Sequence, residues 1–99
     1  MIRGTTPIDD FILPFNIENI DRIKLIYKQD EECVLVKRTE DFLMEGNKIS
    51  VKLSQEETLL FTCKKLAYCI LRVVDKAETA LATDKMYFTV TDCGDDEVL

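Results

Sequence analysis

The chain has 99 residues and a net charge of −6, from 19 acidic and 13 basic side chains. A single domain over residues 1–99 is expected, because a chain of this length buries roughly 60–70% of its unfolded surface. The acidic balance repels phosphates and anionic headgroups, so neither a nucleic-acid partner nor a membrane partner is expected. No apolar run reaches ~18 residues, and the first residues lack the apolar core of a signal peptide, which predicts a protein of the cytoplasm that makes it.

The four cysteines are Cys33, Cys63, Cys69 and Cys93, and no two form a Cys-x-x-Cys pair. Reduced thiols are expected in the cytoplasm, and the sequence leaves open whether any cysteines pair. Structural zinc sites use closely spaced ligand pairs, and the chain has no histidine, so the spacing argues against zinc. Cys69 lies within an alternating apolar stretch and is expected to behave as a small buried hydrophobic residue.

Residues 1–7 contain a glycine and a proline, which predict a flexible lead-in or the start of an edge strand. Residues 9–15 then predict a first strand. Phe11, Leu13 and Phe15 share one parity and are expected on its inner face. A proline between the last two predicts that the strand ends or bulges there.

Residues 22–29 alternate, with Ile23, Leu25 and Tyr27 on one parity and basic side chains on the other, apart from Ile26. This pattern predicts an antiparallel strand with one solvated face. A turn-like acidic run separates them from a second apolar run, residues 33–39, and the two make a plausible hairpin. Residues 40–44 are consistent with a short strand or a bend. Residues 46–47 are a Gly-Asn turn signal, and residues 48–53 show the cleanest alternation in the chain.

A capping box follows, formed by Ser54 and Glu57. Each side chain is expected to accept a hydrogen bond from the backbone N–H of the other residue. This pattern predicts a short helical turn over residues 55–59 that crosses from one sheet to the other. Its role is expected to be structural, because such caps are common at sheet crossings.

Two longer strands close the domain, residues 66–74 and residues 80–91, joined by the polar link 75–79. The inner parity of this hairpin is expected to hold Cys69, Leu71, Val73, Ala82, Met86, Phe88 and Val90, with Asp84 breaking the pattern. Residues 94–99 form an acidic tail.

This order predicts an all-β fold, an immunoglobulin-like Greek-key β-sandwich of about seven strands with one short helical turn. An α/β fold would need an amphipathic helix of ~10 residues or more, and no stretch has that periodicity.

Enzymatic and ligand-binding chemistries find little support, and no catalytic, cofactor-binding or metal-binding residue is predicted. The absence of histidine removes the common Ser-His and Cys-His arrangements, and no Gly-rich loop is present to hold a phosphate. Paired carboxylates fall at predicted turns or in the tail, where solvated charge explains them. Calcium binding by loop carboxylates stays open but lacks a typical ligand spacing.

The remaining candidate is a surface. Tyr68, Ile70 and Tyr87 lie on the outer parity of the final hairpin and form a candidate protein-contact patch, provided that no other element covers it. The alternative is that both parities are partly buried because the hairpin is central, and the sequence favours that alternative.

Five stretches carry a family resemblance: residues 1–7 (Met-Ile-Arg-Gly-Thr-Thr-Pro), 11–15 (Phe-Ile-Leu-Pro-Phe), 53–58 (Leu-Ser-Gln-Glu-Glu-Thr), 81–84 (Leu-Ala-Thr-Asp) and 95–99 (Asp-Asp-Glu-Val-Leu). Over its whole length the chain resembles a family of short β-sandwich proteins encoded in phages and prophages of Gram-positive gut bacteria. It departs from that family at residues 8–10 and in the link 75–79, which lacks the expected glycine. The resemblance implies a protein from a virion structural gene cluster and brings no catalytic role.

The expected function is that of a non-enzymatic structural or assembly protein of the head or tail region. It would act through protein–protein contacts, by self-association or with other virion proteins. An alternative is a small acidic binding or regulatory protein that masks a basic partner surface. An enzyme or a calcium-dependent sugar-binding sandwich is a third, less favoured hypothesis.

Overall fold

The computed structural model describes all 99 residues, and it confirms the all-β architecture expected from the sequence. Eight strands form two antiparallel sheets, one strand more than the seven or so expected. The strands are β1 (Ile8–Ile12), β2 (Ile20–Gln29), β3 (Glu32–Arg38), β4 (Phe42–Glu45), β5 (Lys48–Lys52), β6 (Ala67–Asp75), β7 (Ala80–Ala82) and β8 (Met86–Phe88).

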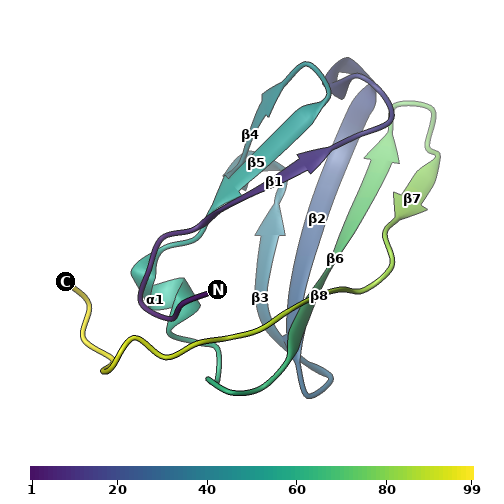
Figure 1. Ribbon diagram of the computed structural model, residues 1–99. Helices are drawn as coiled ribbons and strands as arrows, with labels where there is room; N and C mark the ends of the chain where they lie inside the picture. Colours follow the sequence, from purple (N-terminus) through teal and green to yellow (C-terminus); the bar gives the residue numbers. More distant parts are fainter.

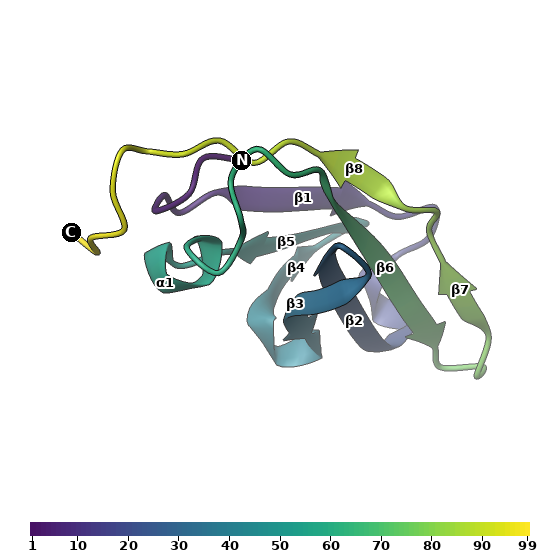
Figure 2. The ribbon, with the colours of Figure 1, turned by 90° about the horizontal axis from the view of Figure 1, so that it is seen from below.

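The small sheet has the strand order β1-β5-β4, and the large sheet has the order β3-β2-β6. Strands β7 and β8 both pair with the far edge of β6, at its C-terminal and N-terminal parts respectively. The two sheets lie in separate layers (Figures 1 and 2), and the chain crosses between them after β1, β3 and β5. Each sheet therefore holds strands that are distant in the sequence.

Period-two alternation places the core between these layers. On β2, the side chains of Ile23, Leu25 and Tyr27 face inward as predicted, and Ile49 and Val51 do the same on β5. Burial of each such side chain contributes ~1.5–3 kcal/mol relative to leaving it exposed. These residues belong to one cluster of 15 buried hydrophobic residues that draws on both sheets.

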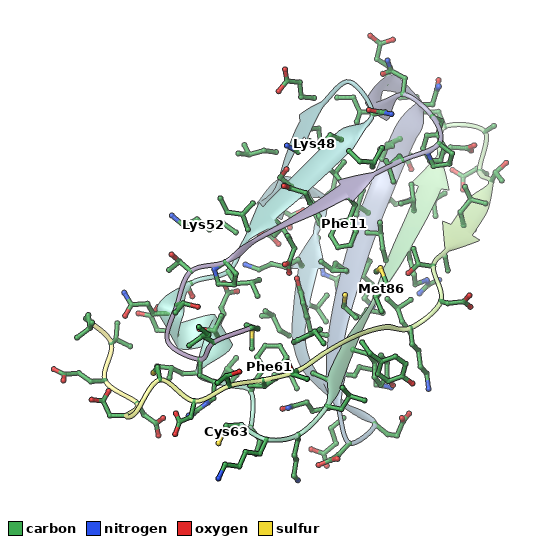
Figure 3. The ribbon with its side chains drawn as sticks, viewed as in Figure 1. Phe11, Lys48, Lys52, Phe61, Cys63 and Met86 are labelled. Carbon is green, nitrogen blue, oxygen red and sulfur yellow. The ribbon has the colours of Figure 1, made fainter.

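The opposite parity of the same strands faces solvent. Lys48 and Lys52 on β5 are exposed, and Figure 3 shows the Lys52 side chain extending away from the ribbon. Phe61, in contrast, is buried, and Phe11 and Met86 pack against the core. The predicted inward parity of the first strand is confirmed in this way, since Phe11 packs against the core. Alternation thus decides which side of each sheet can meet a partner.

Three short helical segments make the crossings: the 3-10 turns η1 (Ile17–Asn19) and η2 (Thr39–Asp41), and the helix α1 (Gln55–Thr58). The capping box at α1 is confirmed. The Glu57 N–H donates to Ser54 Oγ at 3.1 Å, and the Ser54 N–H donates to Glu57 Oε1 at 2.9 Å. No helix in the structure combines the length and the apolar character needed to cross a membrane.

The last predicted strand is interrupted, which corrects the single strand expected over residues 80–91. In β7, Ala82 lies opposite Arg72, whereas in β8 Met86 lies opposite Cys69. Partner residue numbers in an antiparallel pair have a constant sum. This sum is one larger for β8 with β6 than for β7 with β6, so the register shifts by one residue between β7 and β8. Together they form one partner strand of β6 with an extra residue in its middle.

Thr83 stabilises this interruption. Its hydroxyl accepts a hydrogen bond from the Leu71 N–H, and its own N–H donates to the Leu71 carbonyl, both at 3.0 Å. Residues 84–85 are then left opposite the single residue Ile70. Two residues facing one is the pattern of a β-bulge, which bends and twists the strand that carries it.

The bulge also corrects one predicted core position. Ala82 was expected on the inner parity with Met86 and Phe88, but it is exposed on the outer face of the large sheet. Leu81 takes the inner face instead, opposite the buried Val73. Because alternation restarts after the extra residue, Met86 and Phe88 face inward as predicted and pack against the core.

The N-terminal segment lies beside the chain that follows β8. The Thr91 N–H donates to the Met1 carbonyl at 2.8 Å, and the Arg3 N–H donates to the Thr91 carbonyl at 2.9 Å. Further along, the Gly4 N–H donates to the hydroxyl of the buried Thr58 at 2.9 Å. These bonds close the α1 end of the sandwich.

Candidate protein-contact site at the seam between the sheets

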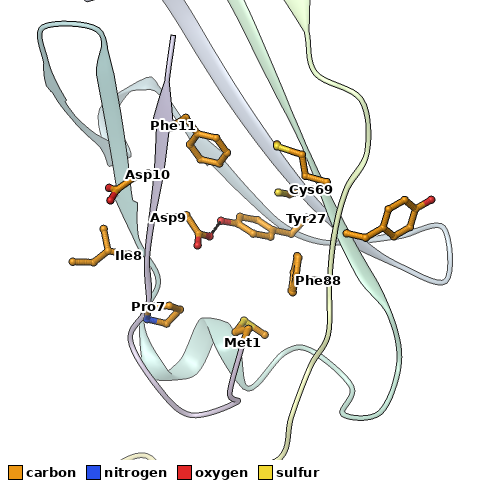
Figure 4. A pocket seen from close by; sticks show the side chains of 11 residues that line it. Met1, Pro7, Ile8, Asp9, Asp10, Phe11, Tyr27, Cys69 and Phe88 are labelled. Carbon is orange, nitrogen blue, oxygen red and sulfur yellow. Dashed lines mark hydrogen bonds between the residues drawn. The ribbon is translucent and has the colours of Figure 1, made fainter.

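An open seam separates the edge of β1 in the small sheet from the edge of β8 in the large sheet. Strand β1 pairs only with β5, and strand β8 pairs only with β6. Between the two unpaired edges lies a groove of about 450 Å³, lined by 11 residues of which eight are hydrophobic (Figure 4). The seam is therefore an apolar groove bordered by two free strand edges.

The backbone at this seam has unused hydrogen-bonding groups. The Pro7 carbonyl and the Leu13 N–H bond to the β5 side of the strand, at 3.0 and 2.7 Å. Bonding positions alternate along an antiparallel strand, so Ile8, Asp10 and Ile12 direct their N–H and C=O groups to the free edge. A free edge of this kind is a template for pairing with another strand.

The same alternation applies on the other border of the seam. Thr89 and Thr91 direct their carbonyls away from β6, where Met1 and Arg3 donate to them at 2.9 Å. Tyr87 has the same parity and directs its backbone groups into the seam. The N-terminal segment thus closes one end of the seam and leaves the part beside β8 open.

Tyr27 and Asp9 form the polar part of the groove floor. The phenol of Tyr27 donates a hydrogen bond to Asp9 Oδ2, drawn as a dashed line in Figure 4. Burial, followed by the hydrogen bond to Asp9, raises the pKa of Tyr27 far above its ordinary value of 10. The phenol therefore stays protonated and acts as a donor.

Asp9 presents its other carboxylate oxygen, Oδ1, without an internal partner. No hydrogen bond or ion pair of the chain reaches that atom, although Asp9 is only half-exposed beside an apolar groove. A partly desolvated carboxylate oxygen forms strong, short hydrogen bonds with cationic donors. The groove thus offers one charged acceptor within an apolar lining.

Three aromatic rings stiffen the floor beneath this pair. Tyr27, Phe61 and Phe88 contact one another edge to face, with centroid separations of 5.8 to 6.1 Å. Such pairs contribute ~0.5–1.5 kcal/mol each beyond the burial of their area. These contacts favour one relative orientation of the three rings at the groove floor.

Cys69 also lines the groove. Burial is the main cause that raises the pKa of its thiol to about 11, with a smaller contribution from Asp9. The thiol therefore stays protonated at neutral pH and is a poor nucleophile. It packs in the core as the sequence predicts, and all four cysteines are free thiols.

The predicted contact patch lies on the outer face of the large sheet and meets the groove only at Tyr87, which also lines it; only one of its members is well exposed. Tyr87 is 58% exposed, Ile70 is half-buried, and Tyr68 is only 5% exposed. The Tyr68 ring is covered by Tyr87, at a centroid separation of 5.5 Å, and by the Lys85 ammonium at 4.8 Å. Its hydroxyl donates to Glu31 Oε2 at 3.2 Å.

Sequence reasoning missed the seam because it joins strands from two sheets. One local signal was present: Asp9 has the same parity as Phe11 and Leu13, so a carboxylate was due to face inward in the first strand. With Asp10 it forms one of the paired carboxylates that the sequence pattern explains by solvated charge. The acidic clusters of the chain do not bring three or more metal-binding side chains together.

Comparisons with protein-family models, with curated proteins and with solved structures give no match to this chain.

Proposed function

We propose that this protein is a non-enzymatic structural or assembly component of a phage or prophage particle that acts through protein–protein contacts at the seam. The observation that carries the contact role is the free edge of β1, which borders a groove lined mainly by hydrophobic side chains. The link to a virion rests on the family resemblance of the sequence. The protein would be made in the bacterial cytoplasm and then join the head or the tail region.

The partner would supply an extended segment that adds to β1 as a further strand. Main-chain hydrogen bonds to Ile8, Asp10 and Ile12 would provide affinity, and alternate side chains of the segment would enter the groove. Oδ1 of Asp9 would select a lysine or arginine at one position, because a cationic donor satisfies it best. The expected partner segment is thus extended, largely apolar and locally basic.

Exposed aliphatic side chains around β1 agree with a contact role. Ile8 and Ile12 on β1 are 61% and 69% exposed, and Leu43 on β4 is 82% exposed, all on the outer face of the small sheet. Asp10, Ser50 and Lys48 lie between these side chains on the same face, so they add apolar area near β1 without forming one continuous patch. A partner that pairs with β1 would also cover part of this face.

The fold itself is proposed to be an immunoglobulin-like Greek key. Its support is the strand order, in which β2 lies beside β6 and β1 lies beside β5, so that both sheets contain long-range neighbours. An experimental structure compared with immunoglobulin-like domains would test this topology. A different order of strand connections would contradict it.

The virion role is tested by mass spectrometry of particles purified from an induced prophage that encodes the protein. The protein is expected in the particles at a fixed ratio to a coat or tail protein. A strictly monomeric protein that is absent from the particles would contradict the assembly role. Capture of a host protein with a basic surface would favour the regulatory alternative.

The seam is tested by a pair of variants at one position. Asp10→Pro removes an N–H from the free edge of β1, whereas Asp10→Ala removes the same carboxylate and keeps the N–H. Asp10→Pro is expected to reduce incorporation into particles by about tenfold, a loss of ~1.4 kcal/mol of binding. Equal incorporation of both variants, with equal melting temperatures, would rule out strand addition at β1.

A further inference from the structure

Three basic side chains stand directly opposite one another across three strands of the large sheet. Lys24 on β2 lies opposite Arg38 on β3 and also opposite Arg72 on β6. These three residues form the basic row. Like charges directly opposite each other on one face of a sheet are destabilising, so this arrangement carries a cost in stability.

No carboxylate of the chain forms an ion pair with the basic row. The ion pairs of the protein involve other cations, including the neighbouring Arg22, which pairs with Asp21 and Glu78 at 2.9 and 3.0 Å. A shallow hollow of about 340 Å³ contains the row and Arg22, and its only acidic lining residue, Glu40, reaches none of them as an ion pair. None of the 19 acidic side chains of the chain therefore forms an ion pair with the three cations of the basic row.

An aliphatic row runs parallel to the basic row, two residues further along each strand. Ile26 lies opposite Val36 on one side and opposite Ile70 on the other. All three are half-buried on the outer face of the large sheet. The two rows together present adjacent positive and apolar stripes that cross the strands at right angles.

We propose that this face binds an amphipathic helix of a protein partner that carries an acidic stripe beside an aliphatic stripe. Three neighbouring strands span about 9–10 Å between the outer two, at 4.7–4.9 Å per strand. A helix that carries acidic residues at positions i, i+4 and i+7 spaces the first and last by about 10.5 Å along its axis. One such helix lying across the strands would place one carboxylate near each cation of the basic row.

Charge and surface chemistry favour a protein segment over nucleic acid or membrane. The net charge of −6 repels a polyanion at long range, whereas an acidic helix needs only local compensation. The aliphatic row would form no favourable contact with phosphates, but it would bury the apolar stripe of a helix. The Tyr68 ring, already covered by Tyr87 and Lys85, is not free to stack on a base. This site is separate from the seam and extends the proposed function to a second partner segment.

The test uses synthetic helical peptides of about 18 residues and fluorescence anisotropy at low salt. The probe peptide carries glutamates at i, i+4 and i+7 beside a leucine stripe. One control peptide replaces the glutamates by lysines, and another replaces the leucines by serines. The probe peptide is expected to bind more tightly than both controls, with an affinity that falls as salt is raised.

Lys24→Glu is expected to weaken binding of the probe peptide by about tenfold or more, because it reverses the central charge of the basic row. Lys52→Glu makes the same charge change on the outer face of the small sheet and is expected to leave the affinity unchanged. The melting temperature of Lys24→Glu should equal or exceed that of the parent protein. If that variant does not fold, Arg38→Gln at the sheet edge replaces it.

Equal binding by the parent protein and by the Lys24→Glu variant would overturn the proposal. So would a lack of binding at about millimolar peptide. Tighter binding of a single-stranded oligonucleotide or of anionic phosphatidylserine vesicles than of the probe peptide would also overturn it. The Asp10→Pro variant should bind the probe peptide normally, so failure at the seam and failure at the basic row are distinguishable.

Discussion

The seam and the basic row differ in how they relate to the core. The floor of the seam is core: Tyr27 is 1% exposed, and Phe88 packs beside it. The basic row lies on the outer face of the large sheet, the face turned away from the small sheet. A contact site made from core residues gains rigidity, but each change in it also changes the stability of the fold. A site on the outer face can be altered with little effect on folding.

The two surfaces also differ in the force that would hold a partner. Strand addition at the seam relies mainly on main-chain hydrogen bonds and apolar burial, with one charge pair at Asp9, so its affinity depends less on ionic strength. Binding at the basic row relies on exposed charges, which salt screens over about 8–10 Å under ordinary conditions. Salt dependence therefore separates the two sites without any mutation.

The largest expected effect comes from two neighbouring positions on β8. Phe88→Ala removes a ring that contacts Tyr27 and Phe61, and it is expected to lower the free energy of unfolding by ~2–4 kcal/mol. Tyr87→Ala, on the outer face of the same strand, is expected to cost under ~1 kcal/mol. Urea denaturation of both variants measures the difference. Equal losses would mean that the seam floor is not part of the core.

A smaller effect is expected from removal of one hydroxyl. Tyr27→Phe takes the donor away from Asp9 and leaves that half-exposed carboxylate without a partner, at an expected cost of ~1–3 kcal/mol. Tyr68→Phe removes a bond to the solvent-exposed Glu31 and is expected to cost at most ~1 kcal/mol. The comparison is made by urea denaturation at neutral pH. A Tyr27→Phe variant as stable as the parent protein would show that Asp9 is satisfied by water.

The smallest effect has the opposite sign. Lys24→Gln removes the middle charge of the basic row and is expected to stabilise the protein by ~0.2–1 kcal/mol at low salt. Added salt should shrink this gain, because it screens the repulsion in the parent protein. Lys52→Gln, opposite Ile8 on the small sheet, is the matched control and should change stability by less than ~0.5 kcal/mol. A clear loss of stability in Lys24→Gln would contradict repulsion within the row.

Features that depend on neighbours along the chain were predictable from the sequence. Alternation identified the inward residues of β2 and β5, and the spacing of Ser54 and Glu57 identified the cap of α1. Each of these features is set by residues two to four positions apart. Local patterns therefore captured most elements and the all-β class.

Features that depend on strand partners were not predictable in the same way. The seam exists because β1 and β8 lie in different sheets, and the basic row exists because Lys24 lies between Arg38 and Arg72. No spacing within one strand encodes those neighbours. The inward parity of Asp9 was a readable sign of the seam, but its meaning required the position of Tyr27.

The bulge at residues 84–85 affects how this protein tolerates changes in length. Loss of Asp84 would leave β7 and β8 in a single register with β6, and no core side chain would change sides. Loss of one residue at most other points in a strand would turn every later side chain of that strand from the core to the solvent. Relatives that are one residue shorter in this stretch should therefore keep the same core, and natural deletions are expected to concentrate there.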